Sequence, residues 1–250
     1  YRQLILQTGS TAHLQLPVSE EASLGQAKAK LETVPSEAAF YQQVGLPLIP
    51  PELREGQVEL AWARERGAPT LLEPHDLRGV LHSHTTYSDG KHSLEEMAQH
   101  CQALGYTYLG VSDHSQVAVY AGGLTVEEIK HQHEEIDRLN EKLAPFKILK
   151  GIEADVLGDG QLDYTDEVLA FFDFVIASVH TGMQMDITRA TDRVHTEIRN
   201  PYTTILAHLT NRLLLKREGF PVDHRAVIDA CAVHGVIIEI NANPWRLELD

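Results

Sequence analysis

The sequence has little cysteine and lacks any long apolar run. Two cysteines in 250 residues, Cys101 and Cys231, lie far apart in predicted helices, so they indicate free thiols and not a disulfide framework. A membrane-spanning helix needs about 18 or more consecutive apolar residues, and no such stretch occurs. Residues 1–9 lack the basic start and apolar middle of a secretory signal. We therefore expect a cytoplasmic chain without a membrane partner, and a monomer.

Basic residues are also scarce. The chain has 21 Lys and Arg against 36 Asp and Glu, which gives a net charge of −15. Non-specific affinity for nucleic-acid backbones comes mainly from clustered Lys and Arg, so a broad nucleic-acid surface is excluded. Fourteen histidines accompany the acidic excess. Bound divalent cations could offset that excess, because carboxylates grouped around metal ions would otherwise repel one another.

The first 75 residues have a weak secondary-structure pattern. They contain a strand candidate at residues 4–7, a turn at 8–10 and a possible helix over 36–44. The proline-rich stretch that starts at Gly45 has neither helical nor strand periodicity. We therefore predict a small remnant of a larger domain over 1–44, an extended connector over 45–75, and a regular domain over 76–250.

From Asp76 onward, short β-rich runs alternate with amphipathic helical stretches. Six strands are predicted, at residues 80–85, 106–112, 147–153, 174–180, 203–208 and 236–241. Helices are predicted between them, at residues 93–104, 125–143, 164–171, 188–199 and 223–233. This alternation is typical of βα units and a parallel sheet, so the fold class is α/β.

Metal-capable side chains recur along these strands with the length of one βα unit. Successive intervals of 30, 39, 27, 28 and 31 residues separate, in order, His84, His114, Glu153, His180, His208 and Glu239. One βα unit spans roughly 30 residues, and α/β barrels place their active sites at the carboxyl ends of the strands. The spacing therefore predicts one donor at each strand end.

The residue types suit a cluster of divalent metals. His82 and His84 point to the same face of a strand because its side chains alternate with a period of two. Asp89 precedes Gly90, where the backbone can turn, and Glu153 can bridge two cations through its two oxygens. With His114, His180 and His208 they form an imidazole and carboxylate set that suits zinc, manganese or iron. Clustered cations activate water for phosphoester hydrolysis.

Each of these residues alone has a simpler structural interpretation, and only their joint spacing favours metal binding. We expect a structural or surface role for the remaining histidines, including His131 and His133, which are predicted to lie on a solvated helix face. Basic residues that could flank a DNA-binding groove, though each is individually more typical of a surface charge, are Arg189, Arg193, Arg212, Lys216 and Arg217.

The motifs resemble those of the PHP (polymerase and histidinol phosphatase) domains. The resemblance rests on His82-Ser83-His84, Asp89-Gly90, Ser112-Asp113-His114, Gly151-Ile152-Glu153, Ser178-Val179-His180 and His208. More narrowly, the segments 46–54, 76–79, 162–164 and 239–247 are similar to the C-terminal half of bacterial family X DNA polymerases. Thr8-Gly9-Ser10 is similar to the nucleotide-binding turn of that polymerase, although Leu14 replaces the Asn that contacts the nucleotide.

This resemblance implies a distorted seven-stranded barrel with up to three metals, zinc or manganese, and Mg²⁺ for the polymerase part. The first metal would be held by His82, His84 and Glu153, the second by Glu153, His180 and His208, and the third by Asp89 and His114. The five residues around the first two metals, His82, His84, Glu153, His180 and His208, would be catalytic. The family's Asp-x-His element on the seventh strand would come after Asp250.

Three functions remain open from the sequence. The first is a 3′-5′ exonuclease or 3′-end processing domain of a DNA-repair polymerase, which acts on DNA through its parent protein. The second is a phosphatase of small phosphate esters, similar to histidinol phosphatase. The third is a module without catalytic activity that supports the polymerase.

Overall fold

The computed structural model describes residues 2–20, 22–29, 35–67 and 70–249, and it divides at Pro74 into two compact units. The first unit, residues 1–74, is helical. Its elements are α1 (Arg2–Thr8), α2 (Thr11–Gln15), α3 (Leu24–Ala29), α4 (Glu37–Gln43), the 3₁₀ helix η1 (Pro51–Leu53) and α5 (Glu59–Arg66). The predicted strand at residues 4–7 is therefore wrong, because these residues lie within α1. The helix predicted over 36–44 is present as α4, which Ser36 caps.

The predicted extended connector over residues 45–75 also needs correction. Most of it packs into the first unit, where Leu46, Ile49, Leu60 and Ala63 are buried. Arg54 holds the proline-rich turn in place by donating hydrogen bonds to the carbonyl of Ile49 at 2.8 and 3.0 Å. The proline-rich stretch lets the chain fold back, so Leu46 and Ile49 become core, and Leu60 and Ala63 are buried one turn apart on α5.

The second unit, residues 75–250, has the predicted βα pattern. Its strands are β1 (Gly79–Val80), β2 (Tyr108–Val111), β3 (Lys147–Asp155), β4 (Phe174–Ser178), β5 (Thr203–Leu206) and β6 (Ile237–Ile238). Its α-helices are α6 (Leu94–Ala103), α7 (Val126–Leu143), α8 (Asp166–Leu169), α9 (Ile187–Ile198) and α10 (His224–His234). Short 3₁₀ helices lie at η2 (Pro74–Asp76) and η3 (Val119–Ala121).

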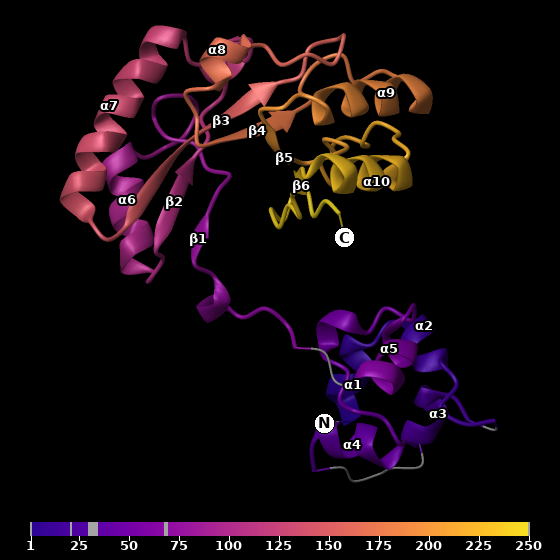
Figure 1. Ribbon diagram of the computed structural model, residues 1–250. Coiled ribbons are helices and arrows are strands. Elements are labelled where there is room, and N and C mark those ends of the chain that lie inside the picture. The colour runs from indigo at the N-terminus through magenta and orange to yellow at the C-terminus, as the bar shows by residue number, and fades with distance from the viewer. Residues whose placement is uncertain (1, 21, 30–34, 68–69, 250) are drawn as a thin grey trace. The chain divides into compact units, whose positions relative to one another are not determined.

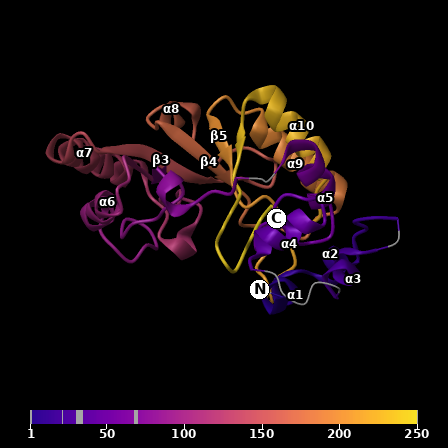
Figure 2. The same ribbon diagram turned by 90° about the horizontal axis from the view of Figure 1, so that it is seen from below.

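All strand pairs are parallel, and the strand order β1-β2-β3-β4-β5-β6 follows the chain. Right-handed crossovers between successive neighbours place the helices on one face, so the sheet curls into part of a barrel. Figures 1 and 2 show α6 and α7 beside the first strands and α9 and α10 beside the last ones. The α/β fold with a curled parallel sheet is confirmed. The seventh strand of the predicted barrel stays a prediction.

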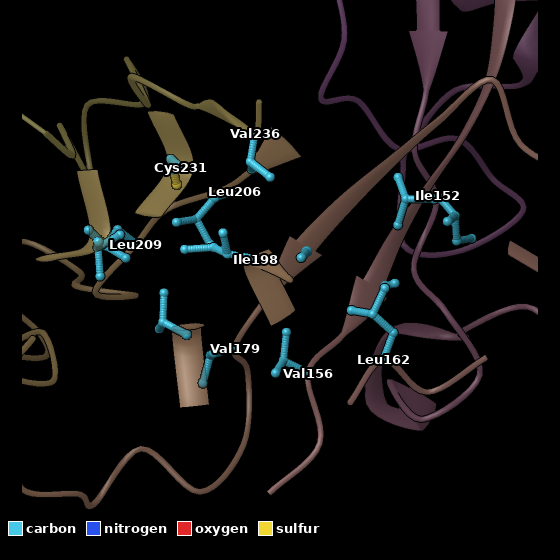
Figure 3. Close-up of a cluster of buried hydrophobic side chains, with 14 of the residues drawn as sticks. Ile152, Val156, Leu162, Val179, Ile198, Leu206, Leu209, Cys231 and Val236 are labelled. Atoms are coloured by element: carbon cyan, nitrogen blue, oxygen red, sulfur yellow. The ribbon is translucent and has the colours of Figure 1, made fainter. Parts of the chain in front are cut away.

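The strand period of two separates an outer core from an inner one. Ile152 and Ala154 on β3 face the helices, where the largest cluster of buried apolar residues lies. Figure 3 shows Leu206 of β5 beside Ile198 of α9 and Cys231 of α10 in this cluster. On the opposite face, Phe174, Ile176 and Ile205 fill the inside of the curl. The inner positions that follow toward the carboxyl ends of the strands carry the polar side chains.

Cys101 and Cys231 are buried free thiols, as predicted. Among the described residues, no helix combines the length and apolarity that a bilayer crossing requires.

Candidate metal centre

The predicted donors gather at the carboxyl ends of the parallel strands. The strands are shorter than predicted, so most donors lie just after them: β1 ends at Val80, two residues before His82, and β4 ends at Ser178, two residues before His180. On β3 the strand is longer, and Glu153 lies within it. A parallel bridge pairs His114 with Glu153 and brings the end of β2 beside β3.

Glu153 is the centre of the cluster. Its carboxylate is 1% exposed, and five imidazoles surround it. The nitrogens nearest to Oε1 are Nε2 of His208 at 2.9 Å, Nε2 of His82 at 3.2 Å and Nε2 of His180 at 3.4 Å. The nitrogens nearest to Oε2 are Nδ1 of His114 at 3.1 Å and Nε2 of His84 at 3.4 Å. Each oxygen therefore serves a separate group of imidazoles, which is the arrangement that a carboxylate bridging two cations needs.

Asp89 completes a third group on the rim. Its Oδ1 lies 3.4 Å from Nδ1 of His84, and its Oδ2 lies 3.8 Å from Nε2 of His114. The loop that carries Asp89 needs Gly90, because a Cβ there would meet the carbonyl oxygen of His84 at 2.3 Å. Buried Asp113 holds the start of this loop by accepting hydrogen bonds from the backbone N–H and the hydroxyl of Thr85, both at 2.7 Å.

Three groups of ligand atoms are each close enough to hold one metal ion. They are His82, His84 and Glu153; His84, Asp89 and His114; and His114, Glu153 and His180. The first group matches the set that the resemblance implies. In the other two, His114 and His84 contribute more than predicted. His208 belongs to none of the three groups, although its imidazole approaches Glu153 and the rings of His82 and His180.

His208 reaches the cluster through an unusual backbone conformation. Leu206 faces the outer core, so alternation along a strand would also turn His208 outward. The φ angle of His208 is +24°, and residues other than glycine rarely adopt a positive φ. This turn directs the imidazole to Glu153 and returns Leu209 to the outer core.

Two further carboxylates, Glu239 and Asp155, support the imidazoles. Oε1 of Glu239 lies 2.5 Å from Nδ1 of His82, and its Oε2 accepts hydrogen bonds from the backbone N–H of His208 and the side-chain amide of Asn241. Oδ1 of Asp155 lies 3.4 Å from Nδ1 of His180. Glu239 is the last residue in the regular spacing of donors along the strands, and no metal was predicted to bind to it. Asp155 was missed, although its position two residues after Glu153 places it on the same strand face.

The electrostatics of the centre are set by burial and by these carboxylates. Burial lowers the pKa of His82, but its hydrogen bonds with Glu153 and Glu239 and their charges outweigh burial and raise it to about 10. Burial also lowers the pKa of His180, but Asp155 and Glu153 outweigh this effect and raise the pKa to about 9. Burial lowers the pKa of His114 and His208. The imidazoles overcome the burial of Glu153 and hold its pKa well below the usual range.

Several buried ligand atoms have no hydrogen-bond partner, which is how the protein would present them to metal ions. They are Nδ1 of His84, His114, His180 and His208 and both carboxylate oxygens of Asp155. Buried polar atoms without hydrogen-bond partners are costly, and leaving them unpaired on these rings and carboxylates has a reason if metal ions bind nearby. The chain thus has histidine and carboxylate clusters that could hold divalent metal ions.

The donors line an open pocket of about 570 Å³, with Glu239, residues 240–243 and Arg246 on one wall. A neighbouring pocket of about 360 Å³ shares Asp89, His114, His180 and Arg246 and adds Tyr120, Asn211, Leu213 and Arg217. Arg217 and Arg246 both donate to Oδ1 of Asn211 at 2.8 Å, which fixes the two guanidinium groups beside the metal ligands. They are the cations best placed to meet an anionic substrate.

Among the other candidates for DNA contacts, Arg193 is corrected to a structural residue. It is buried and donates to the carbonyls of Leu157 and Thr181, both at 2.9 Å. Arg212 donates to the carbonyl of Arg246 at 2.7 Å, and Lys216 lies over the ring of Trp245 at 5.2 Å. Arg189 is exposed.

The predicted solvated histidine face of α7 is wrong at one of its two positions. His131 is exposed, but His133 is partly buried against the ring of Phe172 at 5.1 Å, and burial lowers its pKa to about 4.

In the first unit, the Thr8-Gly9-Ser10 turn is used for structure. Ser10 caps α2, and the Thr8 hydroxyl accepts a hydrogen bond from Arg54.

Known proteins resemble this chain in sequence. The PHP domain family matches residues 81–243. A relative from Bacillus subtilis, named DNA polymerase/3′-5′ exonuclease PolX, is 43% identical over 88% of this chain, and the match covers 38% of the relative. Probable phosphatases from Caldanaerobacter subterraneus and Acetivibrio thermocellus are 29% and 32% identical over 66% and 64% of the chain. The chain spans about 63% of the length of each of these phosphatases.

Proposed function

The chain belongs to the PHP domain family, and from this premise we propose that it is a metal-dependent phosphoesterase that cleaves the 3′ ends of DNA as part of a family X DNA polymerase. The observation that carries the proposal is the convergence of five imidazoles on the two oxygens of buried Glu153, with Asp89 on the rim of the same pocket. The similarity to the PolX relative extends over 220 residues, which include most of the first unit as well.

The seven residues proposed to hold the metals are His82, His84, Asp89, His114, Glu153, His180 and His208. Bound divalent cations supply Lewis acidity there, which activates water and neutralises phosphoryl oxygens. The preferred metals are zinc or manganese, because imidazole and carboxylate donors without thiolates suit both.

The protein's own contribution is to orient the donors and the substrate. Glu239 and Asp155 direct Nε2 of His82 and His180 toward Glu153, because each carboxylate lies against the Nδ1 atom of its partner ring. Arg217 and Arg246, held by Asn211 beside the metal ligands, offer positive charge to the phosphate. The open pocket admits a chain end, and the acidic surface elsewhere disfavours unspecific binding along a duplex.

A small-molecule phosphatase is the second candidate. It is favoured by the similarity to probable phosphatases, which covers about two thirds of the chain. A monoester of a small alcohol would need only the metal ligands and the guanidinium groups. A module that lacks catalytic activity would need neither the metal ligands nor the guanidinium groups.

The test is hydrolysis of a 5′-labelled single-stranded oligonucleotide and of p-nitrophenyl phosphate in Mn²⁺, by wild-type protein, His82→Ala and Glu153→Ala. Glu127→Gln, an exposed change on α7 away from the centre, is the control. Stepwise shortening that both ligand variants lose and the control keeps would support the 3′ nuclease. Turnover of the monoester alone would favour the phosphatase, and full metal occupancy without either activity would favour the non-catalytic module.

A further inference from the structure

An exposed aromatic side chain stands at the edge of the metal centre. Tyr120 is 69% exposed, and its neighbour Val119 is 81% exposed. The Tyr120 ring centroid nevertheless lies 6.2 Å from the ring of His114 and 6.5 Å from the ring of His180. Large apolar side chains at such exposure are unremarkable singly, but this one lines the smaller pocket together with three proposed metal ligands, namely Asp89, His114 and His180.

The loop that carries Tyr120 is firmly held at its base. Ala118 and Ala121, on either side of the exposed pair, are buried. Backbone hydrogen bonds join Ala118 to Ser115 at 3.0 Å and Leu124 to His114 at 2.9 Å, so both ends of the loop are tied to the strand end that carries a proposed ligand. At Gly123 a Cβ would meet the carbonyl oxygen of Ser115 at 1.8 Å, which shows how tightly the loop closes.

The Leu162-Asp163-Tyr164 segment, which the sequence similarity singled out, supports the same loop. Asp163 accepts a hydrogen bond from the backbone N–H of Val117 at 3.0 Å and, through its carbonyl, from the side chain of Gln116 at 2.9 Å. The hydroxyl of Tyr164 accepts from the backbone N–H of Gln116 at 3.2 Å and donates to the carbonyl of Leu124. The backbone that carries Tyr120 is therefore held in place, which reduces the ordering cost when a ligand stacks on its ring.

Charge and shape define what this pocket would accept. Asn211, Leu213 and Arg217, from the loop after β5, line it together with Tyr120, and Arg246 lies in both pockets. If the phosphate of a ligand lies at the metals and the guanidinium groups, the rest of the ligand would extend into the smaller pocket. An aromatic face beside cationic groups is the combination that binds the bases of single-stranded nucleic acids.

We propose that Tyr120 is a stacking platform for the nucleobase of the 3′-terminal nucleotide, so that the smaller pocket selects nucleotide ends over small phosphate esters. This inference rests on the proposed function and names its substrate class. Stacking on an aromatic side chain tolerates every base, as an enzyme that shortens strands stepwise requires.

The ring, not the hydroxyl, is the part that acts. The phenol of a tyrosine is neutral at physiological pH, so it places no negative charge beside a phosphate. A phenylalanine at this position would offer the same face. Tyr120→Phe and Tyr120→Ala therefore form a matched pair.

The test measures binding and cleavage separately. A single-stranded oligonucleotide with 2-aminopurine as its 3′-terminal base and a phosphorothioate at the terminal linkage reports stacking through quenching of its fluorescence. Its partner has an abasic 3′-terminal residue and reports binding by competition. We expect Tyr120→Ala to abolish quenching and weaken binding of the base-bearing end roughly 5- to 150-fold, while binding of the abasic end is unchanged. Tyr120→Phe should behave as wild type.

Two results would overturn the subsite: quenching and affinity retained in Tyr120→Ala, or an equal loss in Tyr120→Phe, which would point to the hydroxyl. Cleavage of unmodified oligonucleotides is followed in the same variants. Wild-type protein that binds and quenches the probe but hydrolyses no phosphoester would refute the proposed activity and leave the subsite standing. Cleavage that depends on His82 but not on the terminal base or Tyr120 would support the proposed activity and refute the subsite.

Discussion

Replacing Glu239 by glutamine should weaken metal binding without removing a ligand. The carboxylate lies 2.5 Å from Nδ1 of His82 and turns Nε2 of that ring to Glu153, 3.2 Å away. Glutamine keeps the size and can still contact the ring, but it loses the charge that raises the basicity of the imidazole. Loss of such a supporting carboxylate typically costs 10- to 100-fold in metal affinity, or about 1.4 to 2.7 kcal/mol.

The side chain of Glu239 also links the two ends of the sheet, which adds a structural contribution. Its Oε2 accepts hydrogen bonds from the backbone N–H of His208 at 2.9 Å and from the side-chain amide of Asn241 at 3.0 Å, and the carbonyl oxygen of glutamine can accept both. We therefore expect Glu239→Gln to fold, whereas Glu239→Ala should lose both metal affinity and thermal stability.

Isothermal titration with Mn²⁺ and Zn²⁺ at fixed pH would measure the affinity of Glu239→Gln, with Glu127→Gln on the surface of α7 as the control. Long-range ¹⁵N NMR of the histidine rings would report whether His82 keeps its proton on Nδ1. Wild-type affinity together with an unchanged His82 tautomer in Glu239→Gln would refute the idea that this carboxylate orients the ligand.

Three further changes test the loop, the core and a buried acid. Gly90→Ala should displace Asp89, because the new Cβ would lie 2.3 Å from the carbonyl oxygen of His84. We expect fewer bound metal ions by elemental analysis, together with a near-native circular dichroism spectrum. Full metal content in this variant would contradict the reasoning. Leu206→Ala should lower the free energy of unfolding of the second unit, measured in urea, by about 2 to 5 kcal/mol, because Leu206 is 2% exposed and packs with Ile198 and Cys231. A loss below about 1 kcal/mol would mean that the core collapses around the gap. Burial raises the pKa of the Glu197 carboxyl well above 4.5, so folding favours its protonated form. The free energy of unfolding should therefore fall as the pH rises above 4.5, by up to about 1.4 kcal/mol per pH unit. Glu197→Gln should lack that fall, and identical slopes for the two proteins would show that the carboxyl is not held neutral.

Local sequence patterns predicted the second unit well. Alternating strand and helix patterns gave six parallel strands and five helices within a few residues, because hydrophobic periodicity and caps such as Ser93 and Thr125 act over short sequence distances. The same reasoning failed in the first unit. There, short helices and a proline-rich turn are held by contacts between distant residues, such as Arg54 with Glu37 at 2.8 Å.

The gathering of the candidate donors at one end of the sheet was also predictable, because histidine and glutamate recurred with the period of a βα unit. The division of those donors into groups was not. His114 and His84 lie closer to several partners than expected, since the shared oxygens of Glu153 decide which rings meet. His208 reaches the centre only because its backbone turns to a φ of +24°, which no pattern in the neighbouring residues indicates.

The sequence by itself determined the α/β class, the alternation of strands with helices and the identity of the residues near the strand ends, because side-chain alternation and helix periodicity are local properties. Tertiary structure alone decided that Glu239 after β6 would lie against His82 after β1, 157 residues away. The physical reason is the curl of the sheet: a small rotation between each pair of neighbouring strands adds up over six strands and brings the first strand end toward the last.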